Sequence, residues 1–167
     1  MGGVDVAKNL IHSALASGKR VVTANKAVIA LHGNELLNEE TRNRLKFEAS
    51  VAGAIPIINL LQGSLVLNRI QQLVGIINGT CNYILTAMEQ QSLSFESALQ
   101  KAQELGFAEA DPSFDIDGID AAHKLTILLS LAFDMPFEFE KIFVEGIRSC
   151  LLYTSPSPRD ATLSRMP

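Results

Sequence analysis

Asp120 and Lys124 have the residue types and the spacing that an acid/base site needs. They are four residues apart, so on a helix their side chains would lie on the same face. A lysine that is desolvated in a closed site can exchange a proton with an alcohol oxygen, and a neighbouring carboxylate can orient it. From the spacing alone, an ordinary surface pair of opposite charge is the simpler interpretation.

An acidic segment at residues 108–117 precedes this pair. Loops that a rigid scaffold holds in place often carry functional groups, so the acids of this segment, Glu109 and Asp115 among them, are candidates for a binding role. The alternative is that these acids only favour the N-terminus of the following helix through its dipole. That alternative suffices for Asp111 and Asp117.

A second lysine, Lys26, follows the short apolar run of residues 21–24. This run is rich in β-branched residues and predicts a buried strand. Ligands of open α/β sheets bind outside the carboxyl ends of the strands, which makes Lys26 a candidate binding residue with Asn25 as its support. The turn at residues 78–80 also follows an apolar run. It could line a pocket or simply open a helix.

The remaining reactive residues and the composition exclude several functions. The three histidines, His12, His32 and His123, have no metal-ligand spacing, and Cys81 and Cys150 are too few for a disulfide framework. A net charge of −4 argues against a general nucleic-acid binder. No apolar run reaches the roughly 20 residues that span a bilayer, and no secretory signal is recognised. A reducing, cytoplasmic setting is expected.

The elements that must position these residues alternate in the first part of the chain. The pattern predicts a helix over 4–16, a strand over 21–24, a helix from Ala27 and another helix over 38–45. Helix and short apolar strand in alternation are typical of a doubly wound α/β domain. No Gly-x-Gly-x-x-Gly turn follows a predicted strand.

The second part of the chain predicts a different arrangement. Strands are expected at the start of 47–61 and over 69–77. Helices are expected over 83–90, from an N-cap at Ser94 to Gly106, and over 118–133. The expected apolar stripe of the helix after Ser94 consists of Phe95, Ala98, Leu99, Ala102 and Leu105. The three prolines and the missing periodicity of residues 150–167 predict a disordered tail, which we interpret as non-native sequence.

Four segments, taken in order, resemble the homoserine dehydrogenase family. They are Val-Val-Thr-Ala-Asn-Lys-Ala at 21–27, Phe-Glu-Ala-Ser-Val-Ala-Gly at 47–53, Gly-Ile-Ile-Asn-Gly-Thr-Cys-Asn-Tyr-Ile-Leu at 75–85, and residues 102–112 together with 115–124. One segment alone would be a weak signal, whereas four at natural spacing are specific. The chain departs from the family at Cys81, where the family commonly has a second threonine.

The resemblance implies an α/β fold and an enzyme that interconverts L-homoserine and L-aspartate 4-semialdehyde with NAD or NADP. It places the enzyme in threonine and methionine biosynthesis, as a homodimer. Residues 1–46 would be the end of a Rossmann-like nucleotide-binding domain and 47–149 an incomplete catalytic domain, so we expect a truncated, inactive fragment. The alternatives are a non-enzymatic dimerising domain of the same fold and another nicotinamide oxidoreductase with a similar catalytic half.

The resemblance also implies a role for each candidate residue. Lys124 would be the acid/base, oriented by Asp120, and Lys26 a second active-site lysine. The implied substrate-binding residues are Glu109, Asp115, Asp120, Asn78, Gly79 and Thr80, the cofactor-binding residues are Lys26, Asn25 and Gly106, and the residues around a monovalent cation, sodium, are Glu48, Val51, Gly53 and Ile55.

Overall fold

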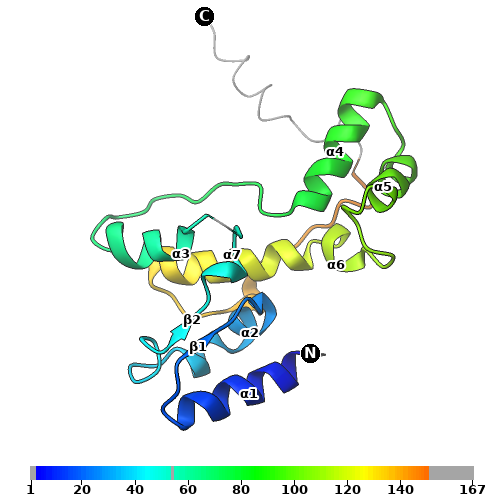
Figure 1. Ribbon diagram of the computed structural model, residues 1–167. Coiled ribbons are helices and arrows are strands. Elements are labelled where there is room, and N and C mark those ends of the chain that lie inside the picture. Colours follow the sequence, from blue (N-terminus) through cyan, green and yellow to red (C-terminus); the bar gives the residue numbers. More distant parts are fainter. Residues whose placement is uncertain (1–2, 54, 151–167) are drawn as a thin grey trace, which may run out of the picture. The chain divides into compact units, whose positions relative to one another are not determined.

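The computed structural model describes residues 3–53 and 55–150, which form two compact units (Figure 1). Of the described residues, 3–53, 55–77 and 120–143 belong to the first unit, and 78–119 and 144–150 belong to the second. Each unit therefore draws on two separate stretches of the chain. The boundary predicted at residue 47 separates two domains of the family, whereas these two units are defined by compactness. The predicted boundary therefore stays a prediction.

The first unit begins with helix α1 (Val4–Ala16), whose predicted bounds are confirmed. Ile11 and Leu15 are buried, while Val6 and Leu10 are each 52% exposed. Partly buried residues at positions 4 and 7 complete the inner face at helical spacing.

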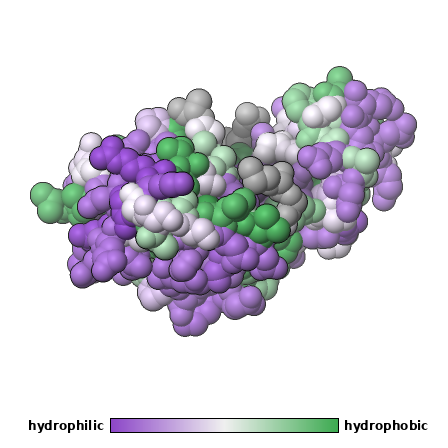
Figure 2. Space-filling view, turned by 60° about the horizontal axis from the view of Figure 1, so that its bottom comes forward, coloured by the Kyte–Doolittle hydropathy of each residue, from purple (hydrophilic) through white to green (hydrophobic). Residues whose placement is uncertain are grey.

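Hydrophilic side chains prevail on the face of the molecule seen in Figure 2, and hydrophobic residues form small groups between them.

A two-stranded parallel sheet follows, formed by β1 (Val21–Val22) and β2 (Leu45–Lys46). Val21 is in register with Leu45, and the Thr23 N–H extends the ladder to the carbonyl of Lys46 at 2.9 Å. Since the strands are parallel, both carboxyl ends meet at one edge. The residues that follow β1 and those that follow β2 therefore leave the sheet on the same side.

Helix α2 (Lys26–Leu36) confirms the helix predicted from Ala27, but the helix predicted over 38–45 is wrong. The Asn38 side chain accepts the N–H groups of Glu40 and Thr41 at 3.0 and 3.1 Å, and the Thr41 hydroxyl donates to the Leu36 carbonyl at 2.6 Å. Short polar side chains that bond their neighbouring backbone compete with helical hydrogen bonds. They form a turn here, which leads into β2.

The strand predicted at the start of 47–61 is also wrong. The strand lies just before it, and the segment itself forms η1 (Glu48–Ser50), α3 (Ile57–Asn59) and the π-helical η2 (Leu60–Ser64). Its apolar residues Val51, Ile58 and Leu61 are buried in the core, as a buried strand would require. An apolar run alone does not distinguish a buried strand from a buried helical segment.

No strand is assigned over 69–77 in the part of the chain that the structure describes. Ile70, Leu73 and Ile77 pack partly buried against the core, whereas Val74 and Ile76 are 82% and 77% exposed. The inward residues thus recur every three or four positions rather than every second one. That spacing does not fit the alternation of a half-buried strand.

Helix α7 (Ile119–Phe133) closes the first unit, and its predicted extent is confirmed. After it, the chain returns through η3 (Phe139–Lys141). The core joins α7 to α1, α2 and the segment after β2. Its buried members are Ile11, Leu15, Val28, Ile29, Ala30, Leu36, Leu45, Phe47, Val51, Ile58, Leu61, Ile127 and Leu128.

The second unit consists of α4 (Gly79–Gln91), α5 (Phe95–Glu104) and the short α6 (Ser113–Ile116). Ser94 is the predicted N-cap of α5 and accepts the Ser97 N–H at 3.2 Å. Ala98 and Ala102 are fully buried as expected, but Leu105 is 57% exposed because the helix has ended before it. The acidic segment at residues 108–117 contains a helical turn, α6.

Helices and a parallel strand pair in one chain agree with the predicted α/β class. Among the described helices, none has the length and apolar character to cross a membrane. The predicted tail begins at Cys150, and its residues 151–167 lie outside the described part of the chain.

Candidate active site

One buried carboxylate in the first unit binds both candidate lysines. Asp120 Oδ1 lies 2.9 Å from Lys26 Nζ, and Asp120 Oδ2 lies 2.6 Å from Lys124 Nζ. The side chain of Asp120 is 5% exposed, that of Lys124 19% and that of Lys26 32%. Three of the predicted site residues therefore come together, and the Asp120–Lys124 pair is not the exposed surface pair of the alternative interpretation.

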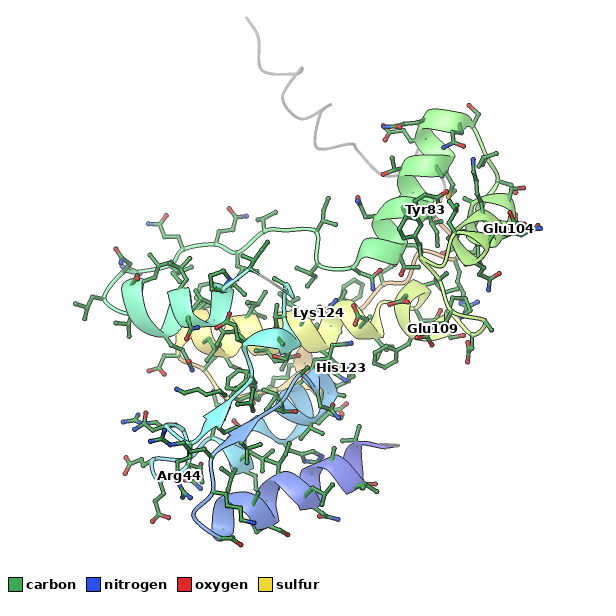
Figure 3. All side chains as sticks on the ribbon, viewed as in Figure 1. Arg44, Tyr83, Glu104, Glu109, His123 and Lys124 are labelled. Atoms are coloured by element: carbon green, nitrogen blue, oxygen red, sulfur yellow. The ribbon has the colours of Figure 1, made fainter. Side chains whose placement is uncertain are left out.

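A backbone carbonyl is a further partner of Lys124. Its ammonium donates to the carbonyl of Ile77 at 2.7 Å, in addition to Asp120. Figure 3 labels Lys124 together with His123, the preceding residue of α7. An ammonium has three N–H donors, so these two acceptors leave one for a ligand. Ile77 could not have been found from residue type, because its backbone carbonyl makes the contact and every residue has one.

The local structure explains why the two lysines lie at the carboxylate. Lys26 is the first residue of α2 and follows the carboxyl end of β1, and the Asn25 side chain caps this helix by accepting the Val28 N–H at 3.1 Å. Asp120 lies in the first turn of α7, where the helix dipole favours a negative charge. Lys124 follows one turn later on the same face. Asn25 thus has a structural role whether or not it also contacts a cofactor.

His123 lies next to this cluster, although no role was predicted for it from the sequence. Its side chain is buried, and its ring packs against that of Phe139 with 4.6 Å between the centroids. Burial, and after it the positive charge of Lys26, lowers the pKa of His123 below the usual value, while Asp120 acts in the opposite direction. Its position three residues after Asp120 on a helix was the signal that could have placed it beside the cluster.

The second unit brings together two other predicted substrate residues. Asn78 is buried and caps α4, since its Oδ1 accepts the Cys81 N–H at 2.8 Å. Its amide nitrogen donates to Asp115 Oδ1 at 2.7 Å, and the Cys81 thiol contacts the backbone carbonyl of Asp115 at 3.2 Å. The turn after residue 77 and the acidic segment are therefore joined directly. Both interpretations of residues 78–80, helix start and pocket wall, remain compatible with this geometry.

The other candidates of the second unit lie at its surface. Thr80 donates to the carbonyl of Phe107 at 2.7 Å, and Phe107 packs on Tyr83 with 4.8 Å between the ring centroids. Gly106 has a φ of 76° and ends α5, so a glycine is favoured there for conformational reasons. The side chain of Glu109 is exposed, and Gln103 holds its backbone carbonyl at 3.1 Å. Gly79 is the first residue of α4.

The predicted cation residues follow β2 in the first unit. Both carboxylate oxygens of Glu48 accept backbone N–H groups, of Ile58 at 2.8 Å and of Asn59 at 2.9 Å. This side chain therefore caps the start of the following helical segment. In residues 3–53 and 55–150, no three His, Cys, Asp or Glu side chains gather as metal ligands would. Among the backbone carbonyls of this loop, that of Glu48 accepts the Val51 N–H at 3.4 Å and that of Ile55 accepts the Ile57 N–H at 2.8 Å.

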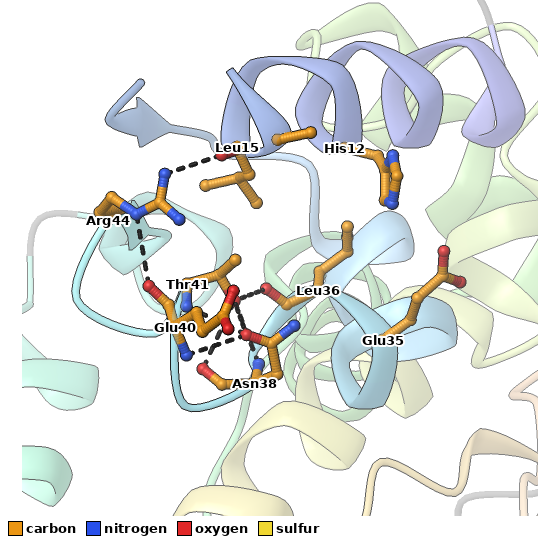
Figure 4. A pocket seen from close by; sticks show the side chains of 9 residues that line it. His12, Leu15, Glu35, Leu36, Asn38, Glu40, Thr41 and Arg44 are labelled. Carbon is orange, nitrogen blue, oxygen red and sulfur yellow. Dashed lines mark hydrogen bonds between the residues drawn. The ribbon is translucent and has the colours of Figure 1, made fainter. Parts of the chain in front are cut away.

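A cavity of about 220 Å³ in the first unit does not belong to these candidates (Figure 4). It lies among α1, α2 and the turn after α2. Two charged groups in its wall have partners: Arg44 donates to the Leu15 carbonyl at 2.7 Å, and Glu35 lies 2.8 Å from Lys8. Lys8 also lowers the pKa of Glu35. None of the predicted site residues lines this cavity.

Comparison with known proteins identifies the relatives of this chain. Residues 56–164 match the model of the family described as homoserine dehydrogenase. The homoserine dehydrogenase of Pseudomonas aeruginosa is 52% identical over 149 residues, which are 88% of this chain and 34% of the relative. That of Bacillus subtilis is 48% identical over 149 residues, again 88% of this chain and 34% of the relative. The chain thus spans about a third of the length of these curated relatives.

Solved structures agree with the sequence comparison and confirm the α/β fold class. The homoserine dehydrogenase of Thiobacillus denitrificans has a TM-score of 0.85 and 47% identity, over 98% of this chain and 37% of that one. A hyperthermophilic archaeal homoserine dehydrogenase in complex with NADPH has a TM-score of 0.78 and 33% identity, over 88% of this chain and 46% of that one. The predicted family is confirmed, and the chain belongs to the homoserine dehydrogenase family.

Proposed function

We propose that this chain carries the acid/base part of an enzyme that interconverts L-homoserine and L-aspartate 4-semialdehyde. The observation that supports this most directly is the buried Asp120 carboxylate with a lysine on each oxygen. The reaction needs one proton at the alcohol oxygen, and a lysine held in a partly desolvated position is suited to transfer it. Membership of the family supplies the substrate.

In this proposal Lys124 is the proton carrier. Its ammonium is held by Asp120 and by the Ile77 carbonyl, and the third N–H would meet the substrate oxygen. In the direction of aldehyde reduction, Lys124 gives its proton to the oxygen that becomes the hydroxyl. In the direction of alcohol oxidation, the hydroxyl proton passes to the lysine amine. Asp120 orients the ammonium in both directions.

The acidic residues are proposed to bind the amino-acid part of the substrate. Homoserine carries an ammonium group, for which carboxylates are the natural partners. Asp115 is positioned by the Asn78 amide at 2.7 Å, and Glu109 is an exposed carboxylate of the same unit. The buried amide of Asn78 also fixes the start of α4. Gly79 and Thr80 would form the wall next to it.

The residues after β1 suit a nicotinamide cofactor, NAD or NADP, which one relative binds as NADPH. Asn25 and Lys26 follow the carboxyl end of a parallel strand, where dinucleotides bind in open α/β sheets. Gly106 has no neighbouring atom within 4 Å of the place where a side chain would begin, so a ligand can approach its backbone. When bound, the nicotinamide would supply the hydride chemistry, and Lys26 would hold its position next to Asp120.

A monovalent cation, sodium, is proposed for the loop after β2. Because the Glu48 carboxylate caps the helical segment, backbone carbonyls of Glu48, Val51, Gly53 and Ile55 would bind the ion. Ala52 and Gly53 have φ values of 58° and 56°. An alanine in the left-handed region is uncommon, and strained backbone is often found where a ligand is bound.

Exposed apolar residues support the proposed homodimer. Val66, Leu67, Val74 and Ile76 are 64%, 96%, 82% and 77% exposed. Apolar surface of this kind is typical of association sites, and we propose that residues 66–76 contribute to the dimer contact. The enzyme would act in the cytoplasm, in threonine and methionine biosynthesis.

A chimera tests the activity. Residues of the Pseudomonas aeruginosa enzyme that match this chain over 149 positions would be replaced by the chain, and homoserine oxidation followed by the absorbance of reduced nicotinamide. We expect turnover, and we expect Lys124→Ala to lower kcat by roughly 100- to 10,000-fold. Lys101→Ala is the control, because Lys101 lies in α5 and its ammonium donates to the exposed Gln91 side chain at 2.7 Å.

The outcomes separate the three interpretations. A folded, dimeric chimera without turnover would favour the non-enzymatic domain. Turnover of another alcohol with none of homoserine would favour a different nicotinamide oxidoreductase. If Lys124→Ala and Lys101→Ala had equal and small effects, Lys124 would not be the acid/base.

A further inference from the structure

The segment that follows α7 is fastened to α2 by an unusual pair of contacts. The Asn34 side chain of α2 donates to the Phe137 carbonyl at 2.9 Å and accepts the Phe137 N–H at 2.9 Å. The two residues are 103 positions apart. Both polar groups of one amide thus pair with both polar groups of one backbone residue, as two strands of a sheet would pair.

The neighbouring Gly33 receives the ring of the same residue. A Cβ at Gly33 would lie 2.6 to 2.7 Å from three carbons of the Phe137 ring, which is closer than nonbonded atoms can approach. Any side chain at this position would therefore displace the ring. Gly33 and Asn34 together form a docking site for Phe137, in which one residue accepts the ring and the other the backbone.

The docked segment also reaches the acid/base cluster. Two residues after Phe137, the ring of Phe139 packs on His123, which lies between Asp120 and Lys124 in α7. Just after the helix end, the Met135 N–H bonds back to the Ser130 carbonyl at 3.2 Å. Residues 134–139 thus contact both α7 and α2, so they connect the helix that carries Asp120 and Lys124 with the helix that begins at Lys26.

This connection matters because Lys26 cannot fix its own position. A lysine side chain is a flexible four-carbon stem with a compact charge, and that of Lys26 is 32% exposed. Its distance to Asp120 depends on where α2 lies against α7. Residue 34 is eight positions along α2 from Lys26, about 12 Å at the rise of an α-helix, so the docking site holds the helix at a second point.

We infer that Asn34, with Gly33, is a positioning residue that sets Lys26 against Asp120 through the docked Phe137. Asn34 contacts neither substrate nor cofactor in this inference and acts only through α2. The inference rests on the proposed function in one respect, because the two lysines need a fixed geometry only if they act together in the proposed reaction. The contacts of Asn34 and Gly33 with Phe137 do not depend on the proposed function.

The test is a spectroscopic measurement on the full chain, with ¹³C-labelled lysine. In Asn34→Ala and Asn34→Asp, we expect the side-chain methylene signal of Lys26 to move toward that of the exposed Lys19. The signal of Lys8 should stay in place, because its partner Glu35 lies on α2 and the pair reports only on α1 against α2. In Asn34→Ala, hydrogen exchange of the Phe137 amide should accelerate by about tenfold, as expected for one lost hydrogen bond.

Asn38→Ala is the matched control. Asn38 also bonds two backbone groups, those of Glu40 and Thr41, but does not contact Phe137. Its replacement should leave the Lys26 signal unchanged. Asn34→Asp keeps the size of the side chain and the acceptor for the Phe137 N–H, so it remains informative if Asn34→Ala does not fold.

Two results would overturn the inference. One is a folded Asn34 variant with rapid exchange at Phe137 and an unchanged Lys26 signal. The other is failure of both Asn34 variants to fold, which would make Asn34 a structural residue of the whole unit. Since neither readout requires turnover, an inactive chimera with a shifted Lys26 signal would contradict the proposed function and leave the positioning role standing.

Discussion

The cluster at Asp120 places one negative charge between two positive ones inside the first unit. Each oxygen of the carboxylate has its own lysine. A buried ion pair contributes little to stability as a whole, but removing one partner leaves an uncompensated charge and is costly. The three residues are therefore better explained by chemistry than by stability. The cluster is therefore expected to be sensitive to the loss of its shared carboxylate.

Asp120→Asn is expected to lower the free energy of unfolding by about 3 kcal/mol, because two ammonium groups would then face each other across a neutral amide. Urea denaturation followed by circular dichroism measures this. The control is Glu35→Gln, which removes the partner of Lys8 at a half-exposed surface position and should have little effect. Equal and small effects of both substitutions would show that the Asp120 cluster is not a buried ion-pair system.

His123 predicts a pH dependence of stability. Its pKa in the folded chain is lowered by burial and by Lys26, whereas in the unfolded chain it is about 6.5. The unfolded state therefore binds more protons between these two values, and stability rises with pH across this window. The contribution is fully present above about pH 6.5 and is lost as the pH falls toward the lower, folded value.

His123→Gln should remove this part of the dependence. We expect the urea midpoint of the parent chain to fall between about pH 7 and pH 5.5 by more than that of the variant. His12→Gln serves as the control, since His12 is exposed on α1. An identical pH profile for the parent chain and His123→Gln would contradict the prediction.

At the scale of elements, helices could be predicted from the sequence where periodicity and capping residues agree. The bounds of α1, the cap at Ser94 and the extent of α7 follow from periodicity and capping residues. The helix expected over 38–45 failed because side-chain bonds at Asn38 outweighed an ambiguous pattern. The strand expected over 69–77 failed because strand formation depends on a partner, which no local pattern contains.

The candidate site, like the secondary structure, could be predicted from the sequence only in part. The spacing of Asp120 and Lys124 places them on one helix face, but that Lys26 joins them is a contact across 94 positions, and only the family resemblance suggested it. The Ile77 carbonyl and the docking of Phe137 on α2 have no signature in residue type or spacing. They follow from the packing of segments that are far apart in the sequence.

The surroundings of Gly146 indicate that the end of the second unit is tightly packed. A Cβ there would lie 2.6 Å from the Ile116 carbonyl oxygen and 2.9 Å from the Asp117 Cα, and neither backbone atom can move aside. The Ile147 N–H also bonds the Ile116 carbonyl at 2.8 Å. We expect Gly146→Ala to lower the free energy of unfolding by about 2 kcal/mol, as overpacking does.

The matched control is Gly79→Ala in the same unit. Gly79 begins α4 and has open space where a Cβ would lie, so this substitution should be neutral or slightly stabilising. Urea denaturation of both variants decides the question. A neutral Gly146→Ala would mean that the backbone after residue 143 can withdraw from α6.

At the scale of the whole molecule, each compact unit has its own core. Ile127 is fully buried in the first and Ile84 in the second. The candidate residues are divided in the same way: the lysines and Asp120 belong to the first unit, and Asn78, Asp115 and Glu109 belong to the second. Separate cores open separately when few contacts couple them. The chain is therefore expected to have two levels of local stability.

Ile84→Ala and Ile127→Ala test this expectation as a pair. Each removes a fully buried side chain and should destabilise its own unit by about 3 kcal/mol. In Ile84→Ala, native-state hydrogen exchange should accelerate in α4 and α5 and stay unchanged in α2, while Ile127→Ala should have the converse effect. If either substitution accelerated exchange equally in both units, the chain would unfold as one cooperative whole, and the division of the candidate residues between two units would have no energetic meaning.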